Sequence, residues 1–91
     1  MFERTATIAS RVGLHARPAA IFAETAAELD LEITIALQGE PVDDAVDAAS
    51  ILSLMGLGAS YGDVVVLRAE GAGAEDALDS LVKLLEIDHD A

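Results

Sequence analysis

Cysteine is absent from the sequence, which excludes disulfides, thiol chemistry and cysteine-based metal sites. Aromatic residues make up only 3% of the chain and Lys83 is the single lysine, so no basic, aromatic-rich surface for nucleic acid is expected. No apolar run approaches the roughly 20 residues of a membrane-spanning helix, and the N-terminus lacks the pattern of a signal peptide. We therefore expect a cytoplasmic protein that binds neither nucleic acid nor membrane.

Acidic residues dominate the charge that is present. The 91 residues include 17 Asp and Glu against 5 Lys and Arg, which gives a net charge of −12. The chain is nevertheless 53% hydrophobic, which predicts one small folded domain over residues 1–91. Because like charges repel, so acidic a protein is expected to be monomeric and to suit the salt-rich cytoplasm of a halophile, where the repulsion is screened.

Hydrophobic periodicity predicts the element order β-α-β-β-α-β-α. Strands are expected over residues 2–8, 31–37 and 64–70. Helices are expected to begin near residues 15–18, to span residues 47–54 and to begin near residue 74. A turn at Gln38-Gly39 leads into a short partner strand over residues 40–43, whose Pro41 lacks a backbone donor and so favours a sheet edge. The expected fold is an α/β (α+β) open-faced sandwich, with three helices on one face of a four-stranded antiparallel sheet.

The two histidines are the candidates for chemistry. His15 and His89 lie near opposite ends of the chain with no ligand spacing around either, so we expect no metal site and no cofactor. His89 belongs to a short polar tail. His15 lies within the segment Gly-Leu-His-Ala-Arg-Pro-Ala-Ala of residues 13–20.

The surroundings of His15 favour phosphoryl chemistry. Pro18 is tolerated in the first turn of a helix, and the unpaired N–H groups and positive dipole end of a helix start attract anions. Arg17 adds a permanent charge whose planar fork matches phosphate oxygens. A neutral imidazole can attack phosphorus near neutral pH, so His15 is the candidate phosphoryl acceptor. The plainer alternative is that His15 caps the helix and Arg17 forms a surface ion pair.

Two segments carry a family resemblance. Residues 13–19 are similar to the active-site signature of the histidine-containing phosphocarrier (HPr) family, and residues 46–58, Val-Asp-Ala-Ala-Ser-Ile-Leu-Ser-Leu-Met-Gly-Leu-Gly, are similar to its serine-site segment. The resemblance covers essentially the whole chain, including the HPr-like order of elements. It implies a carrier protein, not a stand-alone enzyme, of the phosphoenolpyruvate-dependent sugar phosphotransferase system.

The resemblance also implies roles for individual residues. His15 would accept the phosphoryl group on Nδ1 from Enzyme I, which takes it from phosphoenolpyruvate, and would pass it to a sugar-specific enzyme IIA. Arg17 would contact the group, the backbones of Ala16 and Arg17 would offer N–H groups, and Pro18 would organise the helix start. The apolar docking patch for partners would comprise Leu14, Ile51, Leu52 and Met55.

Ser50 matches the family's regulatory serine, which a kinase phosphorylates in some members. Asp47 and Ala49 stand where the family often has asparagine and lysine, and a serine before a short helix is usually an N-cap, a role that Asp47 could also fill. Two alternatives to the sugar relay stay open. One is an HPr-like regulatory docking module that does not need His15, and the other is a carrier for a dihydroxyacetone or nitrogen-signalling branch.

Salt is predicted to stabilise the fold. Raising the salt concentration from about 0.1 M to about 1 M shortens the screening length from about 10 Å to about 3 Å, which weakens repulsion among the acidic residues. The free energy of unfolding, measured by urea denaturation, should therefore rise with sodium chloride. Docking should tolerate high salt as well. Glu24 and Glu28 stand where family members often have lysines, so docking does not depend on an attraction to an acidic Enzyme I that salt would screen. A free energy of unfolding that falls with salt would contradict the prediction.

Overall fold

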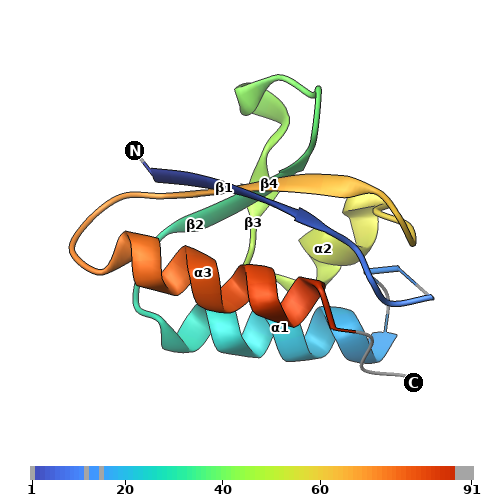
Figure 1. The fold of residues 1–91 in the computed structure, drawn as a ribbon, viewed down its shortest axis with the longest axis horizontal. Coiled ribbons are helices and arrows are strands. Elements are labelled where there is room, and N and C mark those ends of the chain that lie inside the picture. Colours follow the sequence, from blue (N-terminus) through green and yellow to red (C-terminus); the bar gives the residue numbers. More distant parts are fainter. Residues whose placement is uncertain (1, 12, 15, 88–91) are drawn as a thin grey trace.

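The structure is a computed structural model that describes residues 2–11, 13–14 and 16–87. Its elements are β1 (Phe2–Thr7), α1 (Ala16–Glu28), β2 (Ile33–Leu37), a short 3-10 helix η1 (Val42–Asp44), β3 (Val46–Asp47), α2 (Ile51–Leu57), β4 (Val64–Ala69) and α3 (Ala74–Leu85). The predicted order β-α-β-β-α-β-α is therefore confirmed, with η1 as an addition (Figure 1).

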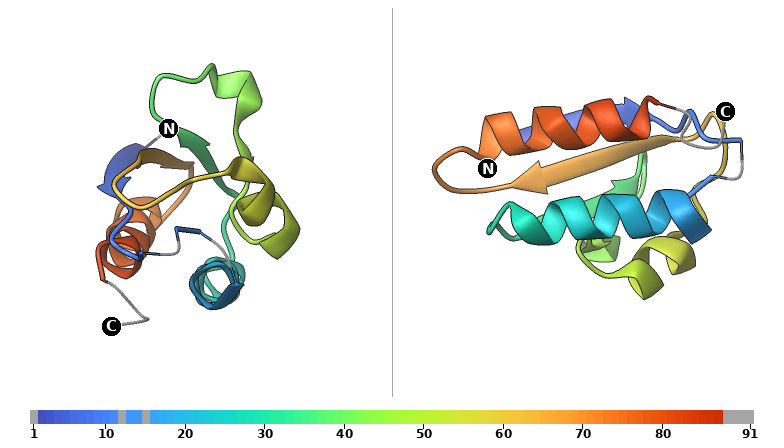
Figure 2. Two further views of the ribbon diagram at one scale, coloured as in Figure 1. Left: turned by 90° about the vertical axis from the view of Figure 1, so that its right-hand side faces the viewer. Right: turned by 90° about the horizontal axis from the view of Figure 1, so that it is seen from below.

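The four strands form one antiparallel sheet in the order β1-β4-β2-β3. β4 lies inside the sheet and pairs with β1 on one side and with β2 on the other, as the apolar run over residues 64–70 predicted. Helices α1, α2 and α3 lie on one side of the sheet (Figures 1 and 2). The open-faced sandwich is thus confirmed. Because β4 pairs with both β1 and β2, the loops at the two ends of β4 lie beside the ends of those two strands.

The core lies between the sheet and the helices. Alternate residues of β4, Val65, Leu67 and Ala69, belong to one buried cluster with Phe22 of α1 and Leu78 of α3. Burying a large aliphatic or aromatic side chain contributes about 1.5–3 kcal/mol. The same alternation leaves every second strand residue facing away from the helices. The apolar side chains buried between the sheet and the helices therefore hold the two layers together.

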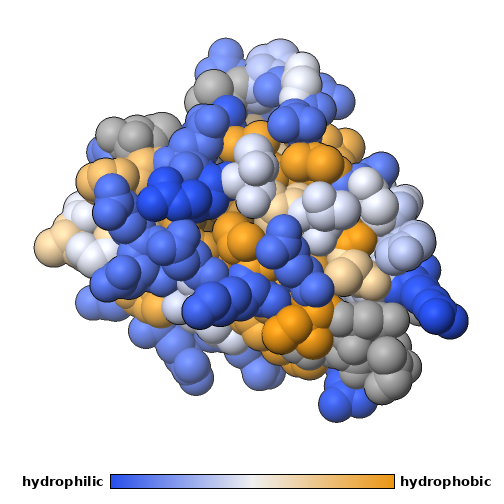
Figure 3. All heavy atoms as spheres, viewed as in Figure 1, coloured by the Kyte–Doolittle hydropathy of each residue, from blue (hydrophilic) through white to orange (hydrophobic). Residues whose placement is uncertain are grey.

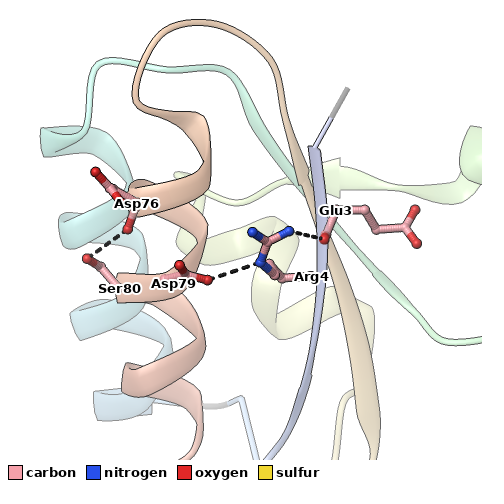
Figure 4. A network of polar contacts seen from close by, with 5 residues as sticks. All are labelled: Glu3, Arg4, Asp76, Asp79 and Ser80. Atoms are coloured by element: carbon pink, nitrogen blue, oxygen red, sulfur yellow. Dashed lines mark hydrogen bonds and ion pairs between the residues drawn. The ribbon is translucent and has the colours of Figure 1, made fainter.

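A polar contact joins the edge strand β1 to α3 at the surface (Figure 4). Arg4 Nε donates to Asp79 Oδ1 at 3.0 Å, and Arg4 Nη1 donates to the carbonyl oxygen of Glu3 at 2.8 Å. On the other side of β1, Arg68 Nε donates to Glu3 Oε2 at 2.9 Å. The exposed Arg4–Asp79 pair contributes at most about 1 kcal/mol. Hydrophilic residues predominate on the face seen in Figure 3.

The predicted strand over residues 40–43 is wrong. That part of the chain forms a turn and η1, and the partner of β2 is the two-residue strand β3, which pairs Thr34 with Asp47 and Ile35 with Val46. Pro41 cannot donate to a strand ladder, and its carbonyl instead accepts the N–H of Asp44 at 3.0 Å to close a helical turn. The expectation that this partner lies at a sheet edge is confirmed.

The second helix also differs from its predicted bounds. Residues 47–54 were expected to be helical, but α2 begins at Ile51, after the N-cap Ser50, and continues through Gly56. It ends at Leu57, and the C-cap Gly58 has a φ of 74°, the left-handed conformation that commonly follows a helix. Asp47 belongs to β3 because its register with β2 outweighs its capping tendency, and its Oδ1 accepts the N–H of Ala49 at 2.9 Å.

Gly13 occupies a position that only glycine fits. Its φ is +72°, and a Cβ built on it would lie 2.5 Å from the carbonyl oxygen of Ala59 and 3.0 Å from the Cα of Ser60. Both neighbours are backbone atoms, which cannot rotate away as a side chain would. The chain before α1 therefore lies directly against the loop between α2 and β4.

Gly13→Ala is predicted to lower the free energy of unfolding by about 2–4 kcal/mol, because it adds steric overlap to the left-handed strain. Gly58→Ala is the matched control. Gly58 has nearly the same φ, +74°, but nothing lies within 4 Å of its Cβ position. Its substitution should cost about 1–2 kcal/mol. Equal shifts of the urea midpoints of the two variants would contradict the close approach.

Candidate functional site

The start of α1 has the composition of an anion site. His15, the predicted acceptor, lies outside the described residues, but its chain neighbours Leu14 and Ala16 are described, and Ala16 is the first residue of the helix. The first turn of α1 contains no acidic residue, whereas that of α3 contains Glu75 and Asp76. No carboxylate within that turn therefore offsets the positive end of the 13-residue helix.

Arg17 follows at the second position of α1, and its side chain is exposed. Two other arginines of the described chain have carboxylate partners, since Arg4 pairs with Asp79 and Arg68 with Glu3. Arg17 has no ion pair with any described residue. Its guanidinium can therefore bind the oxygens of an incoming anion without first leaving another carboxylate of the described chain.

The segment before α1 is held by backbone hydrogen bonds. Leu14 N–H donates to the carbonyl oxygen of Ala59 at 3.0 Å, and Gly13 N–H donates to that of Ser10 at 3.0 Å. Leu14 was predicted to contribute to a docking patch, but its side chain is only 2% exposed and belongs to the core. Burial of this leucine anchors the chain immediately before His15 instead of presenting an apolar surface to a partner.

Helix α2 carries the other predicted docking residues. Leu52 is 83% exposed, and Ile51 and Met55 are exposed as well, while Leu54 of the same helix is fully buried. Figures 1 and 2 both show α2 beside the N-terminal half of α1. The three exposed apolar residues Ile51, Leu52 and Met55, here called the α2 patch, thus lie on a helix next to α1, whose second residue is Arg17.

Ser50 is the N-cap of α2. Its Oγ accepts the backbone N–H of Ser53 at 3.2 Å, and its backbone conformation is extended, as an N-cap requires. Of the two candidate caps in the sequence, the structure therefore selects Ser50. The hydroxyl group that a kinase would phosphorylate, according to the family resemblance, therefore also caps α2.

No helix in the described part of the chain is long and apolar enough to cross a membrane. Over residues 2–11, 13–14 and 16–87, no three His, Asp or Glu side chains are grouped so that they could hold a metal ion. The hollow beneath the segment before α1 is lined mainly by apolar side chains, among them Ile8, Leu14 and Phe22.

The loop over residues 58–63 is a part of the site that the sequence did not reveal. The sequence marked it only by Gly58 and Gly62, which indicate a break between elements. In the structure its backbone meets Leu14 and Gly13 directly. Such a contact between segments more than forty residues apart has no local sequence signal.

Known proteins resemble this chain over most of its length. A family model described as the PTS HPr component phosphorylation site matches residues 2–86. The phosphocarrier protein HPr of Haloferax volcanii is 47% identical over 83 residues, which cover 91% of this chain and 91% of that protein. The phosphocarrier protein HPr of Streptomyces coelicolor is 44% identical over 86 residues, covering 93% and 88%. A crystal structure of a phosphocarrier protein HPr from Bacillus anthracis has a TM-score of 0.82 at 31% identity, covering 92% of this chain and 95% of that one.

Ser50→Ala is predicted to lower the free energy of unfolding by about 1 kcal/mol, because it removes the side chain that caps α2. Ser53→Ala is the matched control, since Ser53 contributes only its backbone N–H to the cap. The control should be neutral or slightly stabilising, because alanine favours helices. The measurement is the urea midpoint of each variant, and a Ser50→Ala midpoint equal to the wild-type value would contradict the capping role.

Proposed function

This chain belongs to the HPr phosphocarrier family and is a phosphoryl carrier of the sugar phosphotransferase system, and from that premise we propose that His15 is the residue that carries the group. In this proposal, phospho-Enzyme I supplies the phosphoryl group and a sugar-specific enzyme IIA receives it. The observation that supports it most is the start of α1, where an exposed Arg17 stands in a first turn without acidic residues. Phosphoryl transfer depends mainly on such positioning and charge stabilisation.

The chemistry is a pair of exchanges at phosphorus. The lone pair of a neutral His15 ring nitrogen attacks the phosphorus on Enzyme I, a nitrogen–phosphorus bond forms, and the bond from phosphorus to Enzyme I breaks. The enzyme IIA acceptor then attacks the same phosphorus and His15 leaves as a neutral ring. No cofactor is needed for either step, and the carrier is not an enzyme on its own.

Arg17 and the start of α1 stabilise the phosphoryl group in this scheme. The guanidinium fork binds two of its oxygens, and the backbone N–H groups of Ala16 and Arg17 are unpaired donors of a first helical turn. Pro18 has no N–H to contribute, but it sets the backbone angle with which the helix begins. These contacts are hydrogen bonds and a charge interaction, so they stabilise the phosphoryl group without preventing its transfer to the next acceptor.

The α2 patch is proposed as the apolar part of the surface that Enzyme I and enzyme IIA contact. Exposed apolar side chains supply contact energy that charges at a rim do not. Leu14 is left out because its side chain is buried. Since both partners contact the same surface, the carrier binds Enzyme I and enzyme IIA one after the other. In this proposal the carrier acts as a monomer in the cytoplasm.

Phosphorylation of Ser50 by a serine kinase is a separate proposal that rests on the family resemblance alone. The added phosphate would stand at the N-terminus of α2, where negative charge is favoured.

Two alternative functions are less favoured. A purely regulatory docking module would not need His15. A carrier for dihydroxyacetone or nitrogen signalling has less support, because both curated relatives described above are HPr proteins.

The experiment that tests the proposal is phosphorylation with labelled phosphoenolpyruvate and Enzyme I in high salt. His15→Ala should accept no label, because no other residue of the chain is proposed as acceptor. His89→Ala, which removes the other histidine, should accept as much label as the wild type. Label on His15→Ala would overturn the proposal.

Arg17→Ala in the same assay should still accept label, but the rate should fall by about tenfold to a hundredfold, because one charge-assisted contact to the transferring group is lost. Its urea midpoint should match that of the wild type, since the side chain is exposed and has no ion pair with a described residue. An unchanged rate would remove Arg17 from the mechanism while leaving His15 in place.

A further inference from the structure

Asp63 closes a turn in the loop that supports the candidate site. Its Oδ2 accepts the N–H of Ser60 at 2.9 Å, and its own N–H donates to the carbonyl oxygen of Ser60 at 3.0 Å. The turn over residues 60–63 is therefore locked from both ends, and Gly62 within it has a φ of +86°. The carboxylate is exposed, so neither core packing nor burial of charge accounts for these contacts.

One peptide group links Asp63 to the residue before His15. The carbonyl of Ala59 and the N–H of Ser60 belong to the same planar peptide group. Its oxygen accepts the N–H of Leu14 at 3.0 Å, while its N–H donates to the Asp63 carboxylate at 2.9 Å. Hydrogen bonding at the N–H side polarises the peptide and strengthens its oxygen as an acceptor. Rotation of this peptide would break both bonds together.

The same turn also holds the far end of the segment that leads to the site. Ile8 N–H donates to the carbonyl of Asp63 and Gly62 N–H donates to the carbonyl of Ile8, both at 2.9 Å. Gly13 lies against the Ala59–Ser60 peptide so closely that a Cβ would overlap its oxygen. Residues 8 and 14 are thus both fixed to one loop, and Asp63 is the side chain that closes that loop.

We propose that Asp63 is a positioning residue for phosphoryl transfer, which acts through the Ala59–Ser60 peptide to fix Leu14, the residue before His15 in the chain. This inference rests on the proposed function of His15. Asp63 does not touch the phosphoryl group. Its role is to hold the acceptor where the transfer geometry requires, because small misplacements in such reactions cost large factors in rate.

Three variants separate the hydrogen bond from the charge. Asp63→Ala removes both the acceptor and the negative charge, whereas Asp63→Asn removes the charge but keeps a side-chain oxygen that can accept from Ser60 N–H. Glu32→Ala removes an exposed carboxylate from the connection between α1 and β2, at the other end of α1 from Arg17. Urea denaturation of all three in high salt establishes that the variants are folded under assay conditions.

The first measurement is the steady-state rate of phosphorylation by Enzyme I as the carrier concentration is varied. Asp63→Ala should lower kcat by about tenfold with KM within about twofold, because the α2 patch that docks is unchanged. Asp63→Asn and Glu32→Ala should stay within about twofold of the wild type. Loss of folded protein alone would scale the apparent rate by the folded fraction, which the urea curves give.

The second measurement is hydrogen exchange of the Leu14 amide, which needs no phosphoryl transfer. Exchange should become about tenfold faster in Asp63→Ala and change little in Asp63→Asn and Glu32→Ala. If wild-type carrier transfers normally and Asp63→Ala matches it in kcat, the inference is overturned while the proposed function stands. It is also overturned if Asp63→Asn is as slow as Asp63→Ala, because charge would then be the cause. If the wild type accepts no phosphoryl group, the proposed function itself fails and takes the role in transfer with it. The Leu14 exchange rates then show only whether Asp63 fixes the backbone.

Discussion

The position of β4 inside the sheet is the constraint on which the rest of the structure depends. β4 pairs with β1 along all six residues of each strand, from Phe2 opposite Ala69 to Thr7 opposite Val64. This register brings the chain that leaves β1 against the loop that enters β4, so Ile8 bonds to Gly62 and Asp63. The candidate site therefore forms where these two segments meet at one end of the sheet. Its backbone is determined by strand pairing, and the site needs no deep pocket.

The distribution of charge is as informative as its sum. A chain with a net charge of −12 repels a phosphoryl group on average. The first turn of α1 is free of acidic residues and contains Arg17, while acidic residues stand in the first turn of α3. Local dipole and guanidinium contacts act over a few ångströms, and in salt the more distant carboxylates are screened. An acidic protein can thus handle a dianionic group at one place on its surface.

Much of this could be predicted from the sequence, for reasons that differ by element. The apolar run of β4 and the helical stripe from Ala74 have strong periodicity, and the structure places both where expected. The prediction of a strand over residues 40–43 was wrong because Pro41 favours a turn over strand pairing. The second helix begins later than predicted because Asp47 belongs to β3. Leu14 could not be assigned correctly, since one apolar residue beside a histidine fits a surface and a core equally well. Asp63 left no signal at all, because its contact with the site runs through a peptide group of a distant loop.

The measurement that tests the central claim most directly is the intact mass of the wild-type protein after incubation with phosphoenolpyruvate and Enzyme I in high salt. The account predicts one added phosphoryl group that is lost in acid and stable in base, which is the behaviour of a phosphohistidine. No added mass on a protein shown to be folded would contradict the account. An added group that survives acid would contradict it as well, because that stability belongs to a phosphate on a hydroxyl such as Ser50.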